Sequence, residues 1–347
     1  MKIFLDDSEC RSLLVPFTRT RHTADIRIGI LTIREKWQIL TNEIAEIITS
    51  TESENDFISI SANIIPTKEN FSQVIELAKN KKPVNETSEI RIIKYPWHIF
   101  QLNDWALRKD FELITTNRTS APVDDSNKLI NPKNIFIEET AVLSHCILNA
   151  EAGPIYIGKN ARVMEGCLIR GPFSLGENSV VKMGTKIYGA TTIGSDCNIG
   201  GEIKNSVVFN FSNKAHDGYL GDSVIGSWCN LGAGTSNSNV KNTAGDVYYQ
   251  LDENSDPIFA GKKAGLLMGD YSRSAINTSF NTGTLIGVCC NIFENEFPKT
   301  YIPDFTWGQE KYDFQKAISH ISNWKKMKNK TISDFEIETL KKLNLKN

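Results

Sequence analysis

Residues 157–200 have the sequence IGKNARVMEGCLIRGPFSLGENSVVKMGTKIYGATTIGSDCNIG. An aliphatic residue recurs there at every sixth position, and the period resumes further along the chain. A six-residue period fits neither an α-helix, which turns about every 3.6 residues, nor an alternating strand. It is typical of a hexapeptide β-helix, in which each hexad forms one short side of a stacked coil. The residues expected to point into the bore are Ile157, Val163, Ile169, Leu175, Val181, Ile187, Ile193, Ile199, Ile225 and Leu231.

The composition narrows the class of protein. The chain has 347 residues, enough for two domains, and a formal net charge of −2, which gives no indication of a nucleic-acid partner. No apolar run approaches the ~20 residues that span a bilayer, and we expect neither a signal peptide nor a membrane partner. The seven cysteines form no CxxC pair. We therefore expect reduced thiols in a cytoplasmic protein, with no metal site.

The order of the elements divides the chain into four segments. Residues 1–116 alternate strand-like and helix-like stretches, which predicts an α/β domain with a mainly parallel sheet. The polar segment 117–133 is expected to be a linker, and the β-helix is expected over 134–308. Helical periodicity returns in 309–347. We expect these C-terminal helices to cover the open end of the solenoid.

The hexad period fails after Ile199, and we expect insertions at 208–215 and 239–261. The first break leads into Ala215-His216-Asp217-Gly218-Tyr219-Leu220-Gly221-Asp222, and Asn230-Leu231-Gly232-Ala233-Gly234-Thr235 follows shortly after. An imidazole can accept the proton of an amine near neutral pH, since its unperturbed pKa is about 6.5. His216 is thus a candidate general base, the alternative being a histidine of a surface loop. Backbone N–H groups among the small residues around Ala233 are candidates to stabilise an oxyanion.

These two stretches resemble the acetyltransferase half of the bifunctional N-acetylglucosamine-1-phosphate uridyltransferase/glucosamine-1-phosphate acetyltransferase family. The resemblance implies a left-handed parallel β-helix, acetyl-CoA as cosubstrate with Ala233 in its site, and His216 as the base. It also implies a homotrimer, because in that family the acetyl-CoA site lies between neighbouring subunits. The residues that it implies for the acceptor sugar phosphate are Lys204, Tyr219, Asn230 and Asn239.

One departure from this family affects the acceptor. The family has a phosphate-binding arginine in the preceding coil, whereas residues 185–189 of this chain contain no arginine. Lys186 can supply a point charge there but not a bidentate fork. A different amino sugar therefore remains open as the acceptor.

The opening residues, with Phe4-Leu5-Asp6-Asp7 and the basic stretch after them, resemble a divergent branch of the sugar nucleotidyltransferases. The resemblance implies a Rossmann-like nucleotidyltransferase-type domain, here truncated, in which Mg²⁺ is needed only if the domain is catalytic. The family's glycine-rich phosphate loop is absent, and Asp6-Asp7-Ser8-Glu9-Cys10-Arg11 stands in its place. Concentrated positive charge suits a phosphate-rich ligand, and the alternative is a solvated basic face. The candidate nucleotide or phosphate contacts are Arg11, Arg19, Arg21, Lys36 and Asn63.

Three functions remain open from the sequence. The first is an acetyl-CoA-dependent N-acetyltransferase acting on a phosphorylated or nucleotide-linked amino sugar, in sugar-nucleotide biosynthesis. The second is a sugar-1-phosphate nucleotidyltransferase, or pyrophosphorylase, with a structural β-helix. The third is a non-catalytic scaffold. A three-histidine zinc site of the γ-type carbonic anhydrases is disfavoured, because only His145 and His216 lie in the solenoid.

Overall fold

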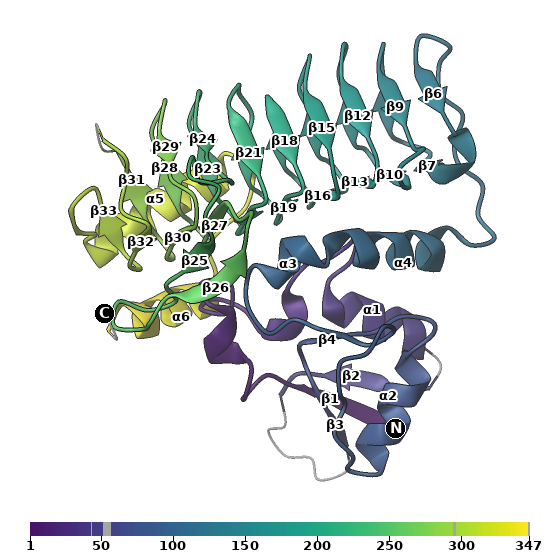
Figure 1. Ribbon diagram of the computed structural model, residues 1–347, viewed down its shortest axis with the longest axis horizontal. Helices are drawn as coiled ribbons and strands as arrows, with labels where there is room; N and C mark the ends of the chain where they lie inside the picture. Colours follow the sequence, from purple (N-terminus) through teal and green to yellow (C-terminus); the bar gives the residue numbers. More distant parts are fainter. Residues whose placement is uncertain (43, 51–56, 294–295, 346–347) are drawn as a thin grey trace.

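The structure, a computed structural model, describes residues 1–42, 44–50, 57–293 and 296–345. A long solenoid of stacked strands lies above a smaller α/β domain, which packs against one of its faces (Figure 1). The parallel β-helix, the amino-terminal α/β region and the C-terminal helices are thus confirmed.

The solenoid has three faces, and nearly all of its neighbouring strands are parallel. The nine-strand face contains β7 (Ile135–Ile137), β10 (Ile155–Ile157), β13 (Phe173–Leu175), β16 (Thr191–Ile193), β19 (Val207–Val208), β22 (Val224–Ile225), β27 (Leu266–Met268), β30 (Thr284–Ile286) and β32 (Tyr301–Ile302). The ten-strand face contains β8 (Val142–Leu143), β11 (Arg162–Val163), β14 (Val180–Val181), β17 (Asn198–Ile199), β20 (Asn213–Lys214), β23 (Asn230–Leu231), β28 (Arg273–Ser274), β31 (Asn291–Ile292), β33 (Thr306–Trp307) and β34 (Glu310–Lys311). The six-strand face contains β6 (Lys128–Ile130), β9 (Ile147–Asn149), β12 (Leu168–Arg170), β15 (Lys186–Tyr188), β18 (Glu202–Lys204) and β21 (Tyr219–Gly221), and the paired strands β24 (Ser236–Asn237) and β29 (Ser279–Phe280) lie beyond it.

The hexad residues fill the bore, as the period predicts. Ile157 pairs with Leu175, and Leu175 pairs with Ile193, so that equivalent residues stack directly on one another. All of the predicted bore residues are at most 3% exposed. Removing these stacked aliphatic side chains from water is the main contribution to the stability of the solenoid.

The first predicted insertion, at 208–215, is wrong. These residues form β19, β20 and the turn between them, and the register passes from Ile193 to Val208 and on to Ile225 without a break. The coils here are shorter, because corner residues are missing, and the bore position opposite Ile199 carries Lys214 instead of an aliphatic residue. Because the corners are shorter and one bore residue is polar, the six-residue spacing is lost here although the strand register continues.

The second predicted insertion, at 239–261, does leave the solenoid. It forms an antiparallel hairpin of β25 (Val247–Tyr249) and β26 (Ile258–Gly261). The ring of Tyr249 stacks on that of Trp97 in the amino-terminal domain at 5.3 Å. The insertion therefore helps to fasten the two parts of the chain together.

Two further expectations differ from the structure. The segment 117–133, expected to be a linker, contains β6, which already pairs with β9 of the six-strand face, as well as part of the 3₁₀ helix η3 (Pro132–Asn134). The helices α5 (Phe314–Lys326) and α6 (Asp334–Asn344) lie along the side of the solenoid instead of over its end. The ammonium of Lys328, just after α5, donates to the carbonyl oxygen of Asp196, which lies several coils before the end of the solenoid.

The amino-terminal domain is built on a parallel sheet, ordered β2 (Glu46–Ile48), β1 (Lys2–Asp6), β3 (Ile58–Ser61). Its other elements are η1 (Arg11–Leu14), η2 (Thr23–Asp25), α1 (Ile33–Thr41), β4 (Ile64–Ile65), α2 (Phe71–Lys79), β5 (Arg91–Ile92), α3 (His98–Gln101) and α4 (Asn103–Thr115). The side chain of Asn103 binds Ala190 and Thr192, so α4 lies on the nine-strand face (Figure 1). One apolar core runs through this domain and the face that it covers. None of the helices in the described ranges combines the length and apolar character that a bilayer crossing needs.

Candidate functional site at a corner of the solenoid

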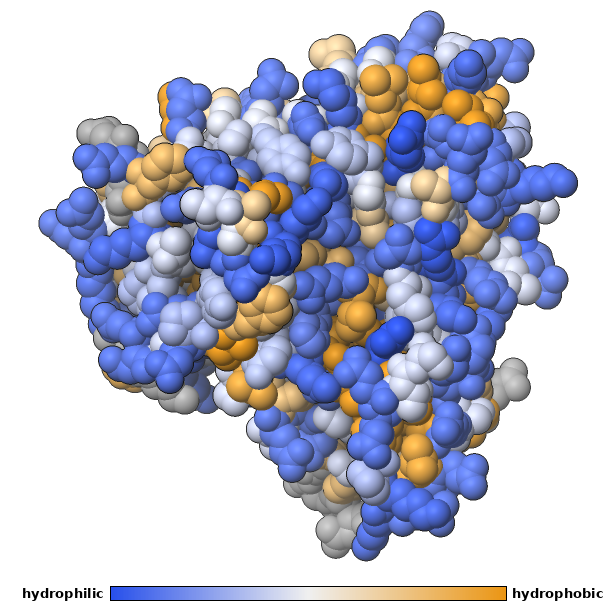
Figure 2. Space-filling model, in the orientation of Figure 1, coloured by the Kyte–Doolittle hydropathy of each residue, from blue (hydrophilic) through white to orange (hydrophobic). Residues whose placement is uncertain are grey.

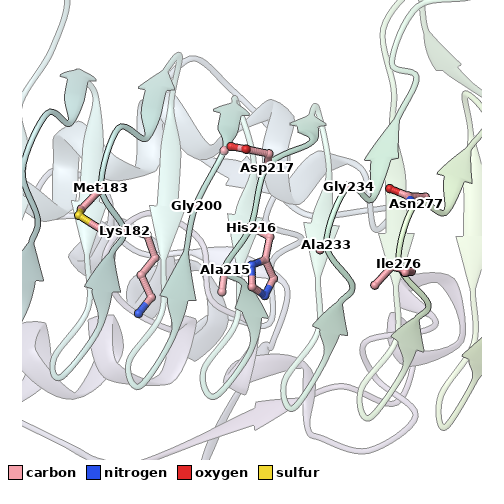
Figure 3. A pocket seen from close by; sticks show the side chains of 11 residues that line it. Lys182, Met183, Gly200, Ala215, His216, Asp217, Ala233, Gly234, Ile276 and Asn277 are labelled. Atoms are coloured by element: carbon pink, nitrogen blue, oxygen red, sulfur yellow. The ribbon is translucent and has the colours of Figure 1, made fainter.

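His216 lies in the turn that joins β20 of the ten-strand face to β21 of the six-strand face. Its side chain is exposed and borders a trough of about 490 Å³ along this corner. Figure 3 shows that the side chains of Lys182 and His216 extend in the same direction from coils on either side of Gly200. The residues that line the trough are Lys182, Met183, Gly200, Gly201, Ala215, His216, Asp217, Ala233, Gly234, Ile276 and Asn277.

The trough has a small-residue floor and apolar ends. Met183 and Ile276 are 70% and 68% exposed, unusual values for large apolar side chains. Between them the lining consists mainly of glycine and alanine, which let an extended ligand approach the backbone closely. The trough is therefore suited to a long, partly apolar ligand lying along the solenoid.

The backbone of residues 232–234 offers one unused donor to this trough. The N–H of Gly232 donates to Ser274, and the N–H of Gly234 donates to the carbonyl oxygen of Asp217. Among the described residues, the N–H of Ala233 has no acceptor. Because a lone backbone N–H can stabilise a developing oxyanion, Ala233 is the candidate donor in this segment.

The six-strand face becomes polar where it approaches His216. Its outward positions carry the exposed apolar residues Ile147 and Leu168 in the first coils. Apolar surface is visible at the upper right of Figure 2, over the region where Figure 1 draws the first strands of this face. In the next coils the same row continues with Lys186, Glu202 and Tyr219. This outward row thus changes from apolar to polar between Leu168 and Lys186, on the coils that lead to the histidine.

Tyr188 and Lys204 occupy the parallel row of this face, directly opposite each other in register. The hydroxyl of Tyr188 donates to Glu202 at 2.5 Å, and this bond raises the pKa of Tyr188 to about 12. The ammonium of Lys204 lies 5.9 Å from the centre of the Tyr188 ring. Among the described residues, no carboxylate forms an ion pair with the ammonium of Lys204.

Tyr219 is held by a network that explains the Tyr-Leu-Gly-Asp stretch. Its ring lies across Gly221, where a Cβ atom would come within 2.2 Å of the phenol oxygen. The amide of Asn239 donates to that oxygen at 3.2 Å and also to the carboxylate of Asp222. The same carboxylate accepts from Asn205 at 2.6 Å. Burial raises the pKa of the Tyr219 phenol, and Asp222 adds to the effect, so the hydroxyl stays protonated.

Replacing Gly221 with alanine should disturb acceptor binding more than folding. The added methyl group would push the Tyr219 ring off the strand and break its contact with Asn239, while the flexible ring can move at little cost. If this face binds the acceptor, we expect the KM for the acceptor to rise about tenfold, because roughly one hydrogen bond to the substrate is lost. The melting temperature should change by a few degrees at most. Tyr219→Phe is the companion variant, because it removes only the hydroxyl and leaves Gly221 unchanged. An unchanged KM in both variants would contradict the assignment.

The structure brings together most, but not all, of the predicted acceptor residues. Lys186, Lys204, Tyr219 and Asn239 share the six-strand face or its edge. Asn230 instead lies outward on the ten-strand face, where Asn198, Asn213 and Asn230 form a ladder of amide hydrogen bonds. A single acceptor held on the six-strand face would not reach Asn230 through the solenoid wall.

The predicted phosphate contacts of the amino-terminal domain are largely engaged elsewhere. Arg21 pairs with Asp270 of the solenoid and lies 4.6 Å from the ring centre of Phe209. Arg19 pairs with Asp304, and Lys36 is fully buried against Asp110. These cations join the two parts of the chain or stabilise the domain interior, so they do not form one phosphate site.

The edge of the sheet where a nucleotide would lie is also filled by the chain itself. Asp7, just after β1, accepts from Arg11 at 2.8 Å and from the backbone N–H of Thr23 at 3.0 Å. Although burial opposes it, these bonds and the neighbouring charges of His22 and Arg11 lower the pKa of Asp7. Asn63 is buried and donates to the carbonyl oxygen of Ile93. The side chains of Asp7 and Asn63 are thus engaged by hydrogen bonds within the chain, which does not fit a Mg²⁺ site, since such a site needs at least one carboxylate oxygen free to join phosphates and waters around the ion.

Sequence comparison bears on this amino-terminal part. Residues 2–82 and 39–119 match the model of a family described as sugar nucleotidyl transferase. The first third of the chain is similar to a sugar nucleotidyl transferase. The match indicates the transferase class and leaves the solenoid unassigned.

Other comparisons add little. No curated protein matches the chain. A solved structure of UDP-N-acetylglucosamine acyltransferase from Arabidopsis shares 13% sequence identity, with 65% of this chain and 88% of that chain covered. Its TM-score is 0.25, so the likeness carries no argument about function.

Sequence reasoning missed several members of the site. Tyr188 and Glu202 lie on neighbouring coils, which an unbroken hexad period does not predict because the coils shorten between them. Asp222 was quoted only as part of a motif, although it binds both Asn205 and Asn239. A register that continues through the shortened coils, from Ile199 to Ile203 and Val208, places Tyr188 and Glu202 on the six-strand face and Asp222 in the turn after β21.

Proposed function

We propose that this chain is an acyltransferase that moves an acetyl group from acetyl-CoA to the amine of a phosphorylated or nucleotide-linked amino sugar. The observation that carries the proposal is the position of His216 on the corner between two differently built faces. On one side lies a small-residue trough suited to an extended acyl donor, and on the other lies the polar cluster of Lys204, Tyr219 and Asn239. A base between an amine and a thioester is what acyl transfer requires.

The positions of His216, Ala233 and Lys204 suggest the following steps of acyl transfer. The imidazole of His216 takes a proton from the amine, whose nitrogen forms a bond to the thioester carbonyl carbon. The N–H of Ala233 donates to the oxyanion that develops on that carbonyl. When the C–S bond breaks, the imidazolium returns its proton to the departing thiolate, so that a free thiol and an amide are the products. Acetyl-CoA supplies the activated acyl group, and Lys204 is placed to bind a phosphate of the acceptor.

The oligomeric state is part of the same proposal. The trough is open along its outer side, and both of its ends carry exposed apolar side chains, those of Met183 and Ile276. Covering these side chains with a neighbouring copy would remove apolar area from water and enclose the ligand. These side chains favour coverage by a neighbouring copy, and the resemblance to the acetyltransferase family implies that the assembly is a homotrimer.

The test is a transfer assay with the purified full-length chain. Acetyl-CoA is supplied with a panel of amino-sugar phosphates and nucleotide-linked amino sugars, and the released thiol is followed. We expect thiol release that depends on the acceptor and yields an N-acetylated product by mass spectrometry. If no acceptor in the panel promotes thiol release, the proposal is wrong.

A second candidate is favoured by the sequence match of residues 2–119 to sugar nucleotidyl transferases. It predicts pyrophosphate release from a nucleoside triphosphate and a sugar-1-phosphate in the presence of Mg²⁺. The engagement of Arg19, Arg21 and Lys36 with Asp304, Asp270 and Asp110 weighs against it. Parallel measurement of pyrophosphate and thiol distinguishes the two activities.

A further inference from the structure

A lysine lies inside the solenoid directly beneath the turn that carries His216. Lys214 ends β20 and pairs with Ile199, and its residue is only 1% exposed. The other bore positions of this face that align with it are Leu143, Val163, Val181, Ile199, Leu231, Ser274 and Ile292. Lys214 is thus the one cation in this row of the described chain.

The ammonium of Lys214 is surrounded by backbone oxygens. It donates to the carbonyl oxygen of His216, to that of Asp217 at 3.1 Å and to that of Gly200 at 3.4 Å. An ammonium has three N–H donors, so these three acceptors use all of them. Burial lowers the pKa of Lys214 to about 8, with the carboxylate of Asp217 opposing the shift, so the group is mainly charged at neutral pH.

The need to fill the bore does not explain why position 214 carries a lysine. Methionine has a similar length and would fill the bore without the cost of burying a charge. No carboxylate forms an ion pair with Lys214 among the described residues, and the more distant carboxylate of Asp217 offsets only part of that cost. What the ammonium does provide is a link between the coil of Gly200 and the turn of His216.

We propose that Lys214 is a positioning residue that holds the turn of His216 from inside the solenoid, through the carbonyl oxygens of Gly200, His216 and Asp217. The imidazole of His216 has no hydrogen-bond partner among the described residues, so its backbone decides where it lies. A displacement of about 1 Å between a base and its substrate can reduce the rate about a hundredfold. This inference rests on the proposed acyl transfer, in which His216 is the base.

The test compares Lys214→Met, which removes the donors, with Lys214→Gln, which retains an N–H donor at similar length. Leu231→Met is the matched control, because it alters the bore of the next coil without touching these carbonyl oxygens. We expect kcat for thiol release to fall at least about tenfold in Lys214→Met and less in Lys214→Gln, with the KM of both substrates changed less than about threefold. The control should retain the wild-type kcat.

Hydrogen exchange supplies a readout that does not depend on activity. The amides of Glu202 and Gly234, in the coils before and after the turn, donate to the carbonyl oxygens of Gly218 and Asp217 within it. They should exchange at least about tenfold faster in Lys214→Met than in wild type and at the wild-type rate in Leu231→Met. Wild-type kcat and exchange in Lys214→Met would overturn the proposal. If Lys214→Met does not fold, Lys214→Gln decides: slower thiol release and faster exchange than in Leu231→Met support the proposal, and kcat and exchange equal to those of Leu231→Met overturn it.

The two proposals fail in different ways. If wild-type protein releases no thiol with any acceptor, the proposed function is wrong, and the exchange of the Glu202 and Gly234 amides still decides whether Lys214 holds the turn. If wild-type protein is active and Lys214→Met behaves like Leu231→Met, only the role of Lys214 is wrong.

Discussion

Replacing His216 with alanine should reduce kcat for acyl transfer by about 10²–10⁴, because general base catalysis contributes a factor of that order. The side chain is exposed at the solenoid corner and forms no hydrogen bond within the described residues, so its loss should leave the fold intact. The trough floor is made by other residues, and acetyl-CoA should still bind. The measurement is thiol release at saturating substrates, with binding of the acyl donor followed by calorimetry.

His145→Ala is the matched control for this prediction. His145 is also an exposed histidine of the solenoid, and within the described residues its imidazole has one hydrogen-bond partner, the neighbouring Ser144 hydroxyl at 3.0 Å. It lies in an early coil, away from the trough. We expect its replacement to leave kcat unchanged. Equal rates in His216→Ala and wild type would show that the histidine is not the base, even if the chain transfers acyl groups.

The regular part of the fold was predictable because its determinant is local and repetitive. From Ile157 to Ile199 every coil side has the same length, so the hexad period alone identifies which side chains enter the bore. The prediction failed where corners shorten, because Lys214 takes an aliphatic position and the spacing changes at the same place. A period search depends on equal spacing, and this stretch violates it while the register of the strands continues.

The site was partly predictable for a different reason. His216 and Tyr219 are close in sequence, and a motif can therefore identify them. The partners of the basic residues are distant in sequence, as with Arg21 and Asp270 or Arg19 and Asp304. Whether a cation binds a ligand or a carboxylate of its own chain depends on contacts between the amino-terminal domain and the solenoid. No local pattern in one sequence contains that information.

The charge pair inside the amino-terminal domain should have the largest effect on stability. Lys36 in α1 and Asp110 in α4 are 0% and 3% exposed, and Asp110 also accepts from the backbone N–H groups of Ile30 at 2.7 Å and Leu31 at 3.0 Å. Asp110→Ala would leave a buried ammonium without a partner. We expect it to lower the free energy of unfolding by about 3–5 kcal/mol, as measured by urea denaturation.

The control for Asp110→Ala lies on the same helix. Asp104 forms an ion pair with Arg108 at the surface, where both side chains are about half exposed, and Asp104→Ala should cost at most about 0.5 kcal/mol. The double variant Lys36→Met/Asp110→Leu should recover only part of the stability. It removes both buried charges, but the backbone N–H groups of Ile30 and Leu31 lose their acceptor. Since α4 also contacts the nine-strand face through Asn103, loss of the pair should loosen the domain from the solenoid. Equal costs for Asp110→Ala and Asp104→Ala would show that the buried pair does not organise this domain.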